Sequence, residues 1–205
     1  MNALARNLIA ASLLAPVVGC ASGPRTRTIA WDPLPFPNDF NWTGSRGAPA
    51  TIEKGDLILQ GQEVSSRGTY RKPLTIECDF LLEKHAAGDG ALIVRFLPPG
   101  QPTDATPKQL VQFELAYRGE TNVTFIQRCD GSVRCKTVWG EEAVLLKDGE
   151  PNHLKLEILS DGMRFAVNGQ TFEASGVTVP YDKFHVRLWS WEPMNRWHVS
   201  NFVVR

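Results

Sequence analysis

Hydrophobic and polar residues alternate along short segments of this chain, from about residue 57 to its end. The clearest alternation spans 74–83, where every second position is apolar: Leu74, Ile76, Cys78 and Phe80. A period of two residues is typical of a β-strand with one buried face and one wetter face. The 3.6-residue period of an amphipathic helix is nearly absent, so the pattern predicts an all-β chain.

Further short segments are rich in β-forming residues and are separated by turn residues. They are 57–59, 91–97, 110–117, 123–128, 133–138, 153–159, 163–167, 171–174, 184–191 and 197–204. The pairs Asp161-Gly162 and Asn168-Gly169 stand between alternating runs and indicate hairpins. About a dozen strands without intervening helices predict a two-sheet antiparallel jelly-roll sandwich.

The first 19 residues are expected to be a signal peptide rather than part of the fold. The apolar stretch 8–18 has the length of a secretory hydrophobic region and is too short to span a hydrocarbon core of ~30 Å. It ends in Val17-Val18-Gly19-Cys20, which resembles a bacterial lipobox, in which the cysteine is lipidated after cleavage. A plain signal peptide with an incidental cysteine is the alternative.

The lipobox resemblance implies a lipid-anchored protein of the cell envelope. Ala21 and Ser22 lack the Asp that is associated with inner-membrane retention, so we expect the outer membrane of a Gram-negative bacterium. Residues 20–38 are rich in proline and are expected to form a tether, followed by one folded domain at 39–205. The mature chain has no second apolar stretch of membrane-spanning length, so the lipid is expected to be its only membrane contact.

Charge and composition exclude some functions. The 22 Lys+Arg balance 22 Asp+Glu, and no run of Lys or Arg occurs. Nucleic-acid binding depends largely on phosphate neutralisation, so we expect no nucleic-acid partner. A hydrophobic content of 42% is enough for a packed core, so the chain is not expected to be disordered.

Three cysteines remain when Cys20 is set aside. Cys129 and Cys135 flank an Asp-Gly turn, and in an oxidising envelope they are expected to form a small local disulfide. A zinc site is the weaker interpretation, because five intervening residues exceed the usual ligand spacing and no second ligand pair follows. Cys78 alternates with apolar residues, which predicts a buried free thiol rather than a nucleophile.

Three of the expected strands carry polar or aromatic residues at their outward positions. These residues are Arg95, Gln112, Glu114, Arg187, Trp189 and Trp191. If the strands lie together, the residues form a platform that suits saccharides, because sugar C–H faces stack on indole rings and hydroxyls take polar partners. The alternative is a cross-strand ion pair between Arg95 and Glu114 on a wet sheet, with the Trp residues covered by a loop.

The segments "PNHLKLEILSDGMRFAVNGQTFEA" and "HVRLWSWEPMNRWHVSNFVVR" resemble the hairpins and closing strands of the concanavalin A-like lectin/glucanase superfamily, including LamG-like domains. Within it, "KGDLILQGQEVSSRGTYRKPLTIECDF", "ALIVRF", "QFELAY" and "VSNFVVR" are similar to the 3-keto-disaccharide hydrolase-type domain. The resemblance covers roughly residues 40–205, and Arg95 and Glu114 fall where that family has an Arg and a Glu on adjacent strands. It implies a jelly roll more strongly than it implies a chemistry.

The chain also departs from that family. Tyr117-Arg118-Gly119 stands where the family has an Asp, and Leu188-Trp189-Ser190-Trp191 replaces its Leu-Gln-x-His pattern. If the hydrolase activity is retained, the resemblance implies Glu114 as the catalytic acid/base, with Arg95 or Arg187 holding the substrate.

Two other groups of residues have a functional and a structural interpretation. Glu77, Asp79 and Glu83 share one strand face, but their spacing is one residue longer than the laminarinase-type pattern, which favours a solvated face. The loop between Trp191 and Trp197 carries Asn195 and Arg196; it is a candidate ligand lip, although a simple hairpin connection is favoured.

No metal or cofactor is expected. His85, His153, His185 and His198 are scattered and have no evident Ser, Cys or Asp partner, and no pair has metal-ligand spacing. A LamG-type calcium site is the alternative, but Asp130, Asp148 and Asp161 show no ligand-loop pattern.

The sequence therefore favours an envelope lipoprotein whose jelly-roll domain binds a saccharide or glycoconjugate. A glycoside hydrolase of the 3-keto-disaccharide type and a non-catalytic envelope scaffold or protein-interaction domain are the alternatives. A recessed acidic pair would favour the enzyme, an open indole-lined groove the binder, and a flat ion-paired face the scaffold.

Overall fold

The computed structural model describes residues 27–28, 40–43, 50–84, 90–100, 110–118, 121–130, 134–147, 149–191, 193 and 195–205. Within these ranges the chain forms β-strands without a helix, and thus no helix that could cross a membrane. The expected signal peptide and the expected lipidation site Cys20 lie outside the described residues.

Strands follow one another along the whole described part of the chain. They are β1 (Arg27–Thr28), β2 (Phe40–Thr43), β3 (Thr51–Glu53), β4 (Asp56–Leu59), β5 (Glu63–Ser66), β6 (Tyr70–Arg71), β7 (Leu74–Lys84), β8 (Gly90–Leu97), β9 (Leu110–Arg118), β10 (Thr121–Asp130), β11 (Arg134–Ala143), β12 (Asn152–Ile158), β13 (Gly162–Val167), β14 (Gln170–Ser175), β15 (Lys183–Trp191) and β16 (Asn195–Val204).

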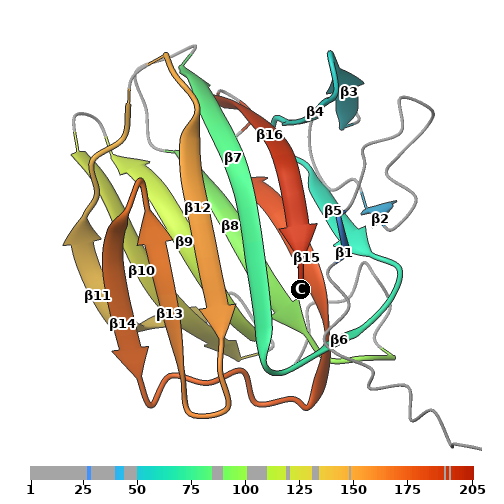
Figure 1. Ribbon diagram of the computed structural model, residues 1–205, viewed down its shortest axis with the longest axis vertical. Coiled ribbons are helices and arrows are strands. Elements are labelled where there is room, and N and C mark those ends of the chain that lie inside the picture. Colours follow the sequence, from blue (N-terminus) through green and yellow to red (C-terminus); the bar gives the residue numbers. More distant parts are fainter. Residues whose placement is uncertain are drawn as a thin grey trace, which may run out of the picture.

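The strands form two antiparallel sheets, which Figure 1 shows as two stacked layers. The sheet in front in that view, which we call the β7 sheet, has the order β14-β13-β12-β7-β16-β4-β3, with β1 paired to β16. The other sheet, which we call the β8 sheet, has the order β11-β10-β9-β8-β15-β5-β2, with β6 paired to β15. The predicted two-sheet antiparallel sandwich is confirmed.

The segments predicted as strands correspond to β4 and to β7 through β16, with differences at their ends. Alternation identified these strands because one face of each packs into the core. It did not identify β5, whose residues Glu-Val-Ser-Ser include a single apolar side chain. Nor did it identify β1, which lies within the segment expected to be a tether and pairs with the end of β16.

The hydrophobic core lies between the sheets and is built from the inward positions of both. From β7 it receives Leu74, Ile76, Cys78, Phe80 and Leu82, and from β9 it receives Val111, Phe113 and Leu115. Burial of a large apolar side chain contributes about 1.5–3 kcal/mol, so this layer holds the two sheets together. Burial also raises the pKa of the Cys78 thiol to about 12, which agrees with the predicted buried, unreactive thiol.

Candidate functional site

A row of polar side chains crosses the outer face of the β8 sheet. Ser65 of β5 lies opposite Arg187 of β15, and Arg187 lies opposite Arg95 of β8. Arg95 lies opposite Gln112 of β9, and Gln112 opposite Gln127 of β10. On β8, β9 and β15 both neighbours of the row residue belong to the core, as Val94 and Phe96 do beside Arg95, so alternation directs the row away from the core.

A second row runs beside the first, two residues along each strand. Glu63 lies opposite Trp189, Trp189 opposite Ile93, and Ile93 opposite Glu114. The two rows together contain five of the six residues predicted from the sequence as a contact set: Arg95, Gln112, Glu114, Arg187 and Trp189. The geometry thus brings these residues together on one sheet face, whereas their role in binding stays a prediction.

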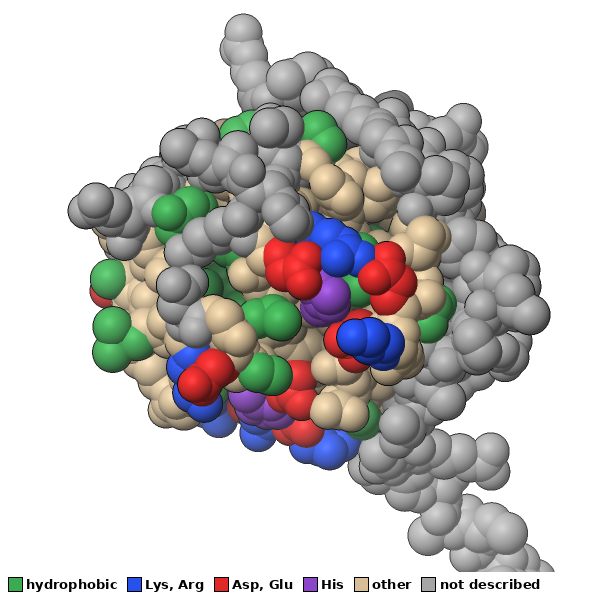
Figure 2. Space-filling model, turned by 90° about the horizontal axis from the view of Figure 1, so that it is seen from above, with side chains coloured by type: hydrophobic (Ala, Val, Ile, Leu, Met, Phe, Trp, Pro, Cys, Tyr) green, Lys and Arg blue, Asp and Glu red, His purple; other side chains and the backbone are tan. Residues whose placement is uncertain are grey.

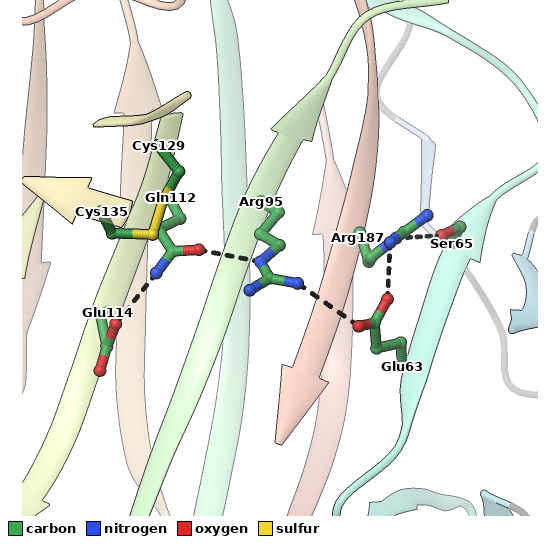
Figure 3. Close-up of polar contacts among 8 residues, drawn as sticks. All are labelled: Glu63, Ser65, Arg95, Gln112, Glu114, Cys129, Cys135 and Arg187. Atoms are coloured by element: carbon green, nitrogen blue, oxygen red, sulfur yellow. Dashed lines mark hydrogen bonds and ion pairs between the residues drawn. A yellow bond between two sulfur atoms is a disulfide. The ribbon is translucent and has the colours of Figure 1, made fainter. Parts of the chain in front are cut away.

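The carboxylate of Glu63 contacts both arginines. Its Oε2 accepts a hydrogen bond from Arg187 Nη1 at 2.6 Å, and its Oε1 lies 3.4 Å from Arg95 Nη1 (Figure 3). Arg187 Nε also donates to Ser65 Oγ at 2.8 Å. Two guanidinium groups on adjacent strands therefore share one carboxylate.

The network continues through Gln112 on β9 (Figure 3). Arg95 Nε donates to Gln112 Oε1 at 2.8 Å, and Gln112 Nε2 donates to Glu114 Oε2 at 3.1 Å. The same amide nitrogen lies 2.9 Å from Gln127 Oε1. The expected cross-strand partner of Arg95 was Glu114, but Gln112 occupies the opposite position and accepts the hydrogen bond from Arg95.

Burial distinguishes this network from an ordinary surface. Glu63 is 9% exposed, Glu114 8% and Arg187 6%, although all three are on the outer side of the sheet. Desolvation lowers the pKa of Arg95 to about 10, while Glu63 and Glu114 act against that shift and Arg187 adds to it. A wet, ion-paired sheet face would leave these groups exposed, so that alternative is disfavoured.

The indole rings have different surroundings. The Arg95 guanidinium carbon lies 3.8 Å from the centre of the Trp189 ring, so one face of this indole is covered by a cation. Trp189 also packs against a small apolar cluster on the same outer face, formed by Ala91, Ile93, Ala116 and Phe125. Trp191 is 38% exposed and lies opposite Ala91, so it presents the more accessible indole.

The disulfide between Cys129 and Cys135 is present and joins β10 to β11. Cys129 lies two residues from Gln127 and packs with Leu97 and Leu110 beside the polar row. The loop that the two cysteines were expected to close is partly outside the described residues. The bond thus borders the candidate site and fixes the strand that carries Gln127.

Glu77, Asp79 and Glu83, which the sequence predicted on a solvated strand face, lie on the outer face of the β7 sheet. Glu77 pairs with Arg205, and Asp79 accepts a hydrogen bond from Asn201 Nδ2 at 2.6 Å. Glu83 pairs with Arg196 at 2.9 Å. These pairs are partly exposed, and their arrangement agrees with a solvated, ion-paired face.

The histidines on this sheet correct one expectation. His153 Nδ1 lies 2.8 Å from Asp79 Oδ1, and His198 Nε2 lies 3.0 Å from Glu83 Oε1, so both have carboxylate partners that the sequence did not reveal. The partners come from strands distant in sequence. Figure 2 views the upper end of the molecule, where basic and acidic side chains surround a histidine.

The loop after Trp191 is a structural connection in its described part. Pro193 packs closely against Gly61, and its carbonyl accepts a hydrogen bond from Gln60 Nε2 at 2.9 Å. Asn195 is buried, and Arg196 pairs with Glu53 and Glu83 on the β7 sheet. Arg196 is therefore directed away from the polar row. The loop joins β15 of the β8 sheet to β16 of the β7 sheet, so it is a connection between the two sheets and not the expected hairpin.

Three members of the network were missed by sequence reasoning: Glu63, Ser65 and Gln127. Glu63 and Ser65 flank Val64 on β5. One apolar residue does not make an alternating pattern, so the sequence did not predict this strand. Gln127 lies on a predicted strand, opposite Gln112 of the preceding strand. Pairing of these two strands in a hairpin would have placed it beside Gln112. Across the residues that the structure describes, no group of three or more His, Cys, Asp or Glu could hold a metal ion.

No model of a known protein family and no functionally curated protein matches the sequence. Solved structures do match. Lectin II from Ulex europaeus superposes with a TM-score of 0.61 at 9% identity, covering 89% of this chain and 98% of the lectin. β-Agarase A from Zobellia galactanivorans gives 0.58 at 8% identity, covering 81% of this chain and 82% of the agarase.

The β-glucanase of Bacillus licheniformis gives a TM-score of 0.51 at 14% identity, covering 86% of this chain and 96% of the glucanase. At these identities the likeness establishes the fold and leaves the chemistry to be argued from the site. The narrower resemblance to 3-keto-disaccharide hydrolase-type domains stays a prediction. The chain therefore has the jelly-roll fold of the concanavalin A-like lectins and glucanases.

Proposed function

We propose that the outer face of the β8 sheet binds a saccharide or glycoconjugate. The observation that carries the proposal is the polar row from Ser65 to Gln127, which is buried or partly buried along its length and is bordered by Trp189 and Trp191. Saccharide hydroxyls both donate and accept hydrogen bonds, and the amide and guanidinium groups of this row, with the carboxylates of the row beside it, offer both functions. Indole rings at the border offer surface to the apolar C–H faces of a sugar.

The energetics also favour a ligand role over a purely structural one. A buried charge network is often no more stabilising than apolar residues of the same volume, because desolvation offsets the attraction. The core of this sandwich already holds the sheets together without polar groups. A network of four charged groups on the outer side of one sheet is therefore better explained as a preorganised recognition surface.

The fold neighbours support the proposal in general terms, because one is a lectin and two are named as a glucanase and an agarase. Binding is favoured over hydrolysis by the placing of the carboxylates. Glu63 and Glu114 are three strands apart, which separates their backbones by about 14 Å. A glycosidase with two catalytic carboxyl groups needs each of them available to the substrate, whereas both oxygens of Glu63 face guanidinium groups.

A glycan array combined with a thermal-shift screen of the full-length protein in detergent tests this proposal. We expect binding to a saccharide, and Glu114→Gln and Trp189→Ala should each weaken it at least about tenfold. Glu77→Gln makes the same chemical change on the other sheet and should leave binding unchanged. Sugar release that Glu114→Gln abolishes would establish the hydrolase instead, and an array without any binding would refute the saccharide site.

We further propose that the protein is anchored by a lipid on Cys20 in the outer membrane. The support is the sequence Val17-Val18-Gly19-Cys20 after an apolar stretch of signal-peptide length. Metabolic labelling with a radioactive fatty acid, followed by membrane fractionation, tests this. Label in the outer-membrane fraction that Cys20→Ser removes is the expected result, and unlabelled wild-type protein would refute the anchor.

A further inference from the structure

We propose that Glu63 makes this site select uncharged saccharides over anionic ones. This inference rests on the proposed function and assigns a specificity-determining role to a residue that the sequence pattern did not single out. The observation behind it is that Glu63 contacts both arginines of the polar row, with a different oxygen on each: Oε2 on Arg187 and Oε1 on Arg95.

Arginine is the side chain best suited to bind carboxylate and sulfate groups, through two parallel N–H donors. Two arginines on adjacent strands would thus form a strong site for uronic acids or sulfated sugars. In this protein the arginines are already bonded to other groups. Arg187 bonds to Glu63 and Ser65, and Arg95 bonds to Glu63 and Gln112 and covers one face of Trp189.

The charges of the network also sum to zero. Arg95 and Arg187 contribute two positive charges, and Glu63 and Glu114 contribute two negative charges. An anionic sugar would have to compete with Glu63 for the arginines and would approach the buried Glu114 carboxylate. Neither cost applies to a neutral saccharide, whose hydroxyls can bond to the row without disturbing its charge balance.

The contacts of the two carboxylates assign this role to Glu63 rather than to Glu114. Both oxygens of Glu63 face guanidinium groups, whereas Glu114 Oε2 accepts a hydrogen bond from the uncharged Gln112 amide. Loss of Glu63 would leave Arg95 and Arg187 with a net positive charge in a poorly solvated setting, which is the arrangement that attracts an anion. Removing this one carboxylate should therefore invert the preference.

The test measures the affinity of full-length protein in detergent for neutral oligosaccharides and for their uronate and sulfated counterparts. Wild-type protein should prefer the neutral member of each pair by about tenfold or more, and Glu63→Gln should reverse the order. Glu63→Asp keeps the charge and should keep the neutral preference. Glu77→Gln, the same change on the β7 sheet, should bind like wild type.

If Glu63→Gln does not fold, the salt dependence of wild-type binding decides. Affinity for a neutral oligosaccharide should change less than about twofold between low and high NaCl, and a steep fall would overturn the inference. A wild-type preference for anionic sugars, or an unchanged neutral preference in folded Glu63→Gln, would also overturn it while leaving the saccharide site intact. Absence of binding to every saccharide would refute the proposed function itself.

Discussion

At the scale of single residues, the surroundings of a polar group determine how much it contributes to the stability of the fold. Arg187 is 6% exposed and donates hydrogen bonds to Glu63 and Ser65. Arg164, by contrast, has a side chain that is 46% exposed and lies 3.8 Å from Glu157. Each arginine lies beside a carboxylate. Removal of Arg187 would leave the buried Glu63 carboxylate without its nearest partner, whereas removal of Arg164 would leave only a more exposed carboxylate.

We therefore expect Arg187→Met to lower the free energy of unfolding by about 3–5 kcal/mol. Arg164→Met, the matched change at the exposed pair, should lower it by less than about 1 kcal/mol. Urea unfolding followed by circular dichroism measures both values. Equal losses of unfolding free energy in the two variants would show that burial does not make the Glu63–Arg187 pair more important for stability than the exposed pair.

Cys78 gives a second residue-scale prediction. Its thiol is 2% exposed, and burial raises its pKa to about 12, so neither access nor ionisation favours reaction. In a Cys20→Ser variant, Ellman's reagent should leave the folded protein unmodified and react with one thiol after denaturation. Rapid modification of the folded protein would contradict the buried position of Cys78.

At the scale of elements, one hairpin turn depends on an asparagine for two reasons. Asn168 and Gly169 join β13 to β14 with positive φ at both positions, which is typical of a type I′ turn. The Asn168 side chain also accepts from the His153 amide at 2.9 Å and donates to the Leu145 carbonyl at 2.9 Å. The turn thereby ties the hairpin to β12 and to the segment before it.

Two substitutions separate these contributions. Asn168→Gly keeps the backbone conformation and loses the side-chain bonds, so we expect a loss of about 1–2 kcal/mol. Asn168→Ala loses the bonds and also strains the backbone, so its loss should be larger by about 1 kcal/mol. Thermal or urea unfolding measures the order. A glycine variant as stable as wild type would mean that the hydrogen bonds contribute nothing.

The contact between β7 and β16 predicts a pH dependence. Burial raises the pKa of Asp79, but the hydrogen bond from Asn201 and the contact with His153 outweigh burial and hold this pKa below its ordinary value. A carboxyl with a lowered pKa in the folded state stabilises the fold above its unfolded-state pKa, and this stabilisation is lost as the pH falls through the folded value.

The free energy of unfolding should therefore fall as the pH drops below about 4. Asp79→Asn removes this carboxyl and should make the decline shallower. Urea unfolding between neutral pH and pH 3 measures both curves. If the two curves decline in parallel, Asp79 does not contribute to the acid sensitivity.

The elements also show what a sequence can and cannot predict. Strands with one face in the core alternate clearly, as β7 and β12 do, and both were predicted. β5 was not, because Val64 is its only apolar residue. The outward directions of Arg95 and Glu114 followed from alternation. The contact of Glu63 with Arg187, by contrast, depends on pairing between strands more than 100 residues apart in the chain.

At the scale of the whole molecule, the sandwich gives its two outer faces different characters. The outer face of the β7 sheet carries partly exposed ion pairs, including those of Glu77 and Glu83. The outer face of the β8 sheet carries the largely buried polar row and the indoles of Trp189 and Trp191. We propose that the saccharide binds to the outer face of the β8 sheet and not to that of the β7 sheet.

Side-chain NMR of the tryptophans tests this claim most directly. Trp189 and Trp191 lie on the proposed binding face, whereas Trp197 is buried in the core and Trp139 packs against Phe165. We would titrate the protein with a panel of neutral oligosaccharides and follow the indole N–H signals, assigned by Trp→Phe variants. We expect the signals of Trp189 and Trp191 to shift while those of Trp139 and Trp197 stay unchanged. A panel that moves no indole signal, or one that moves only Trp139 or Trp197, would contradict the claim.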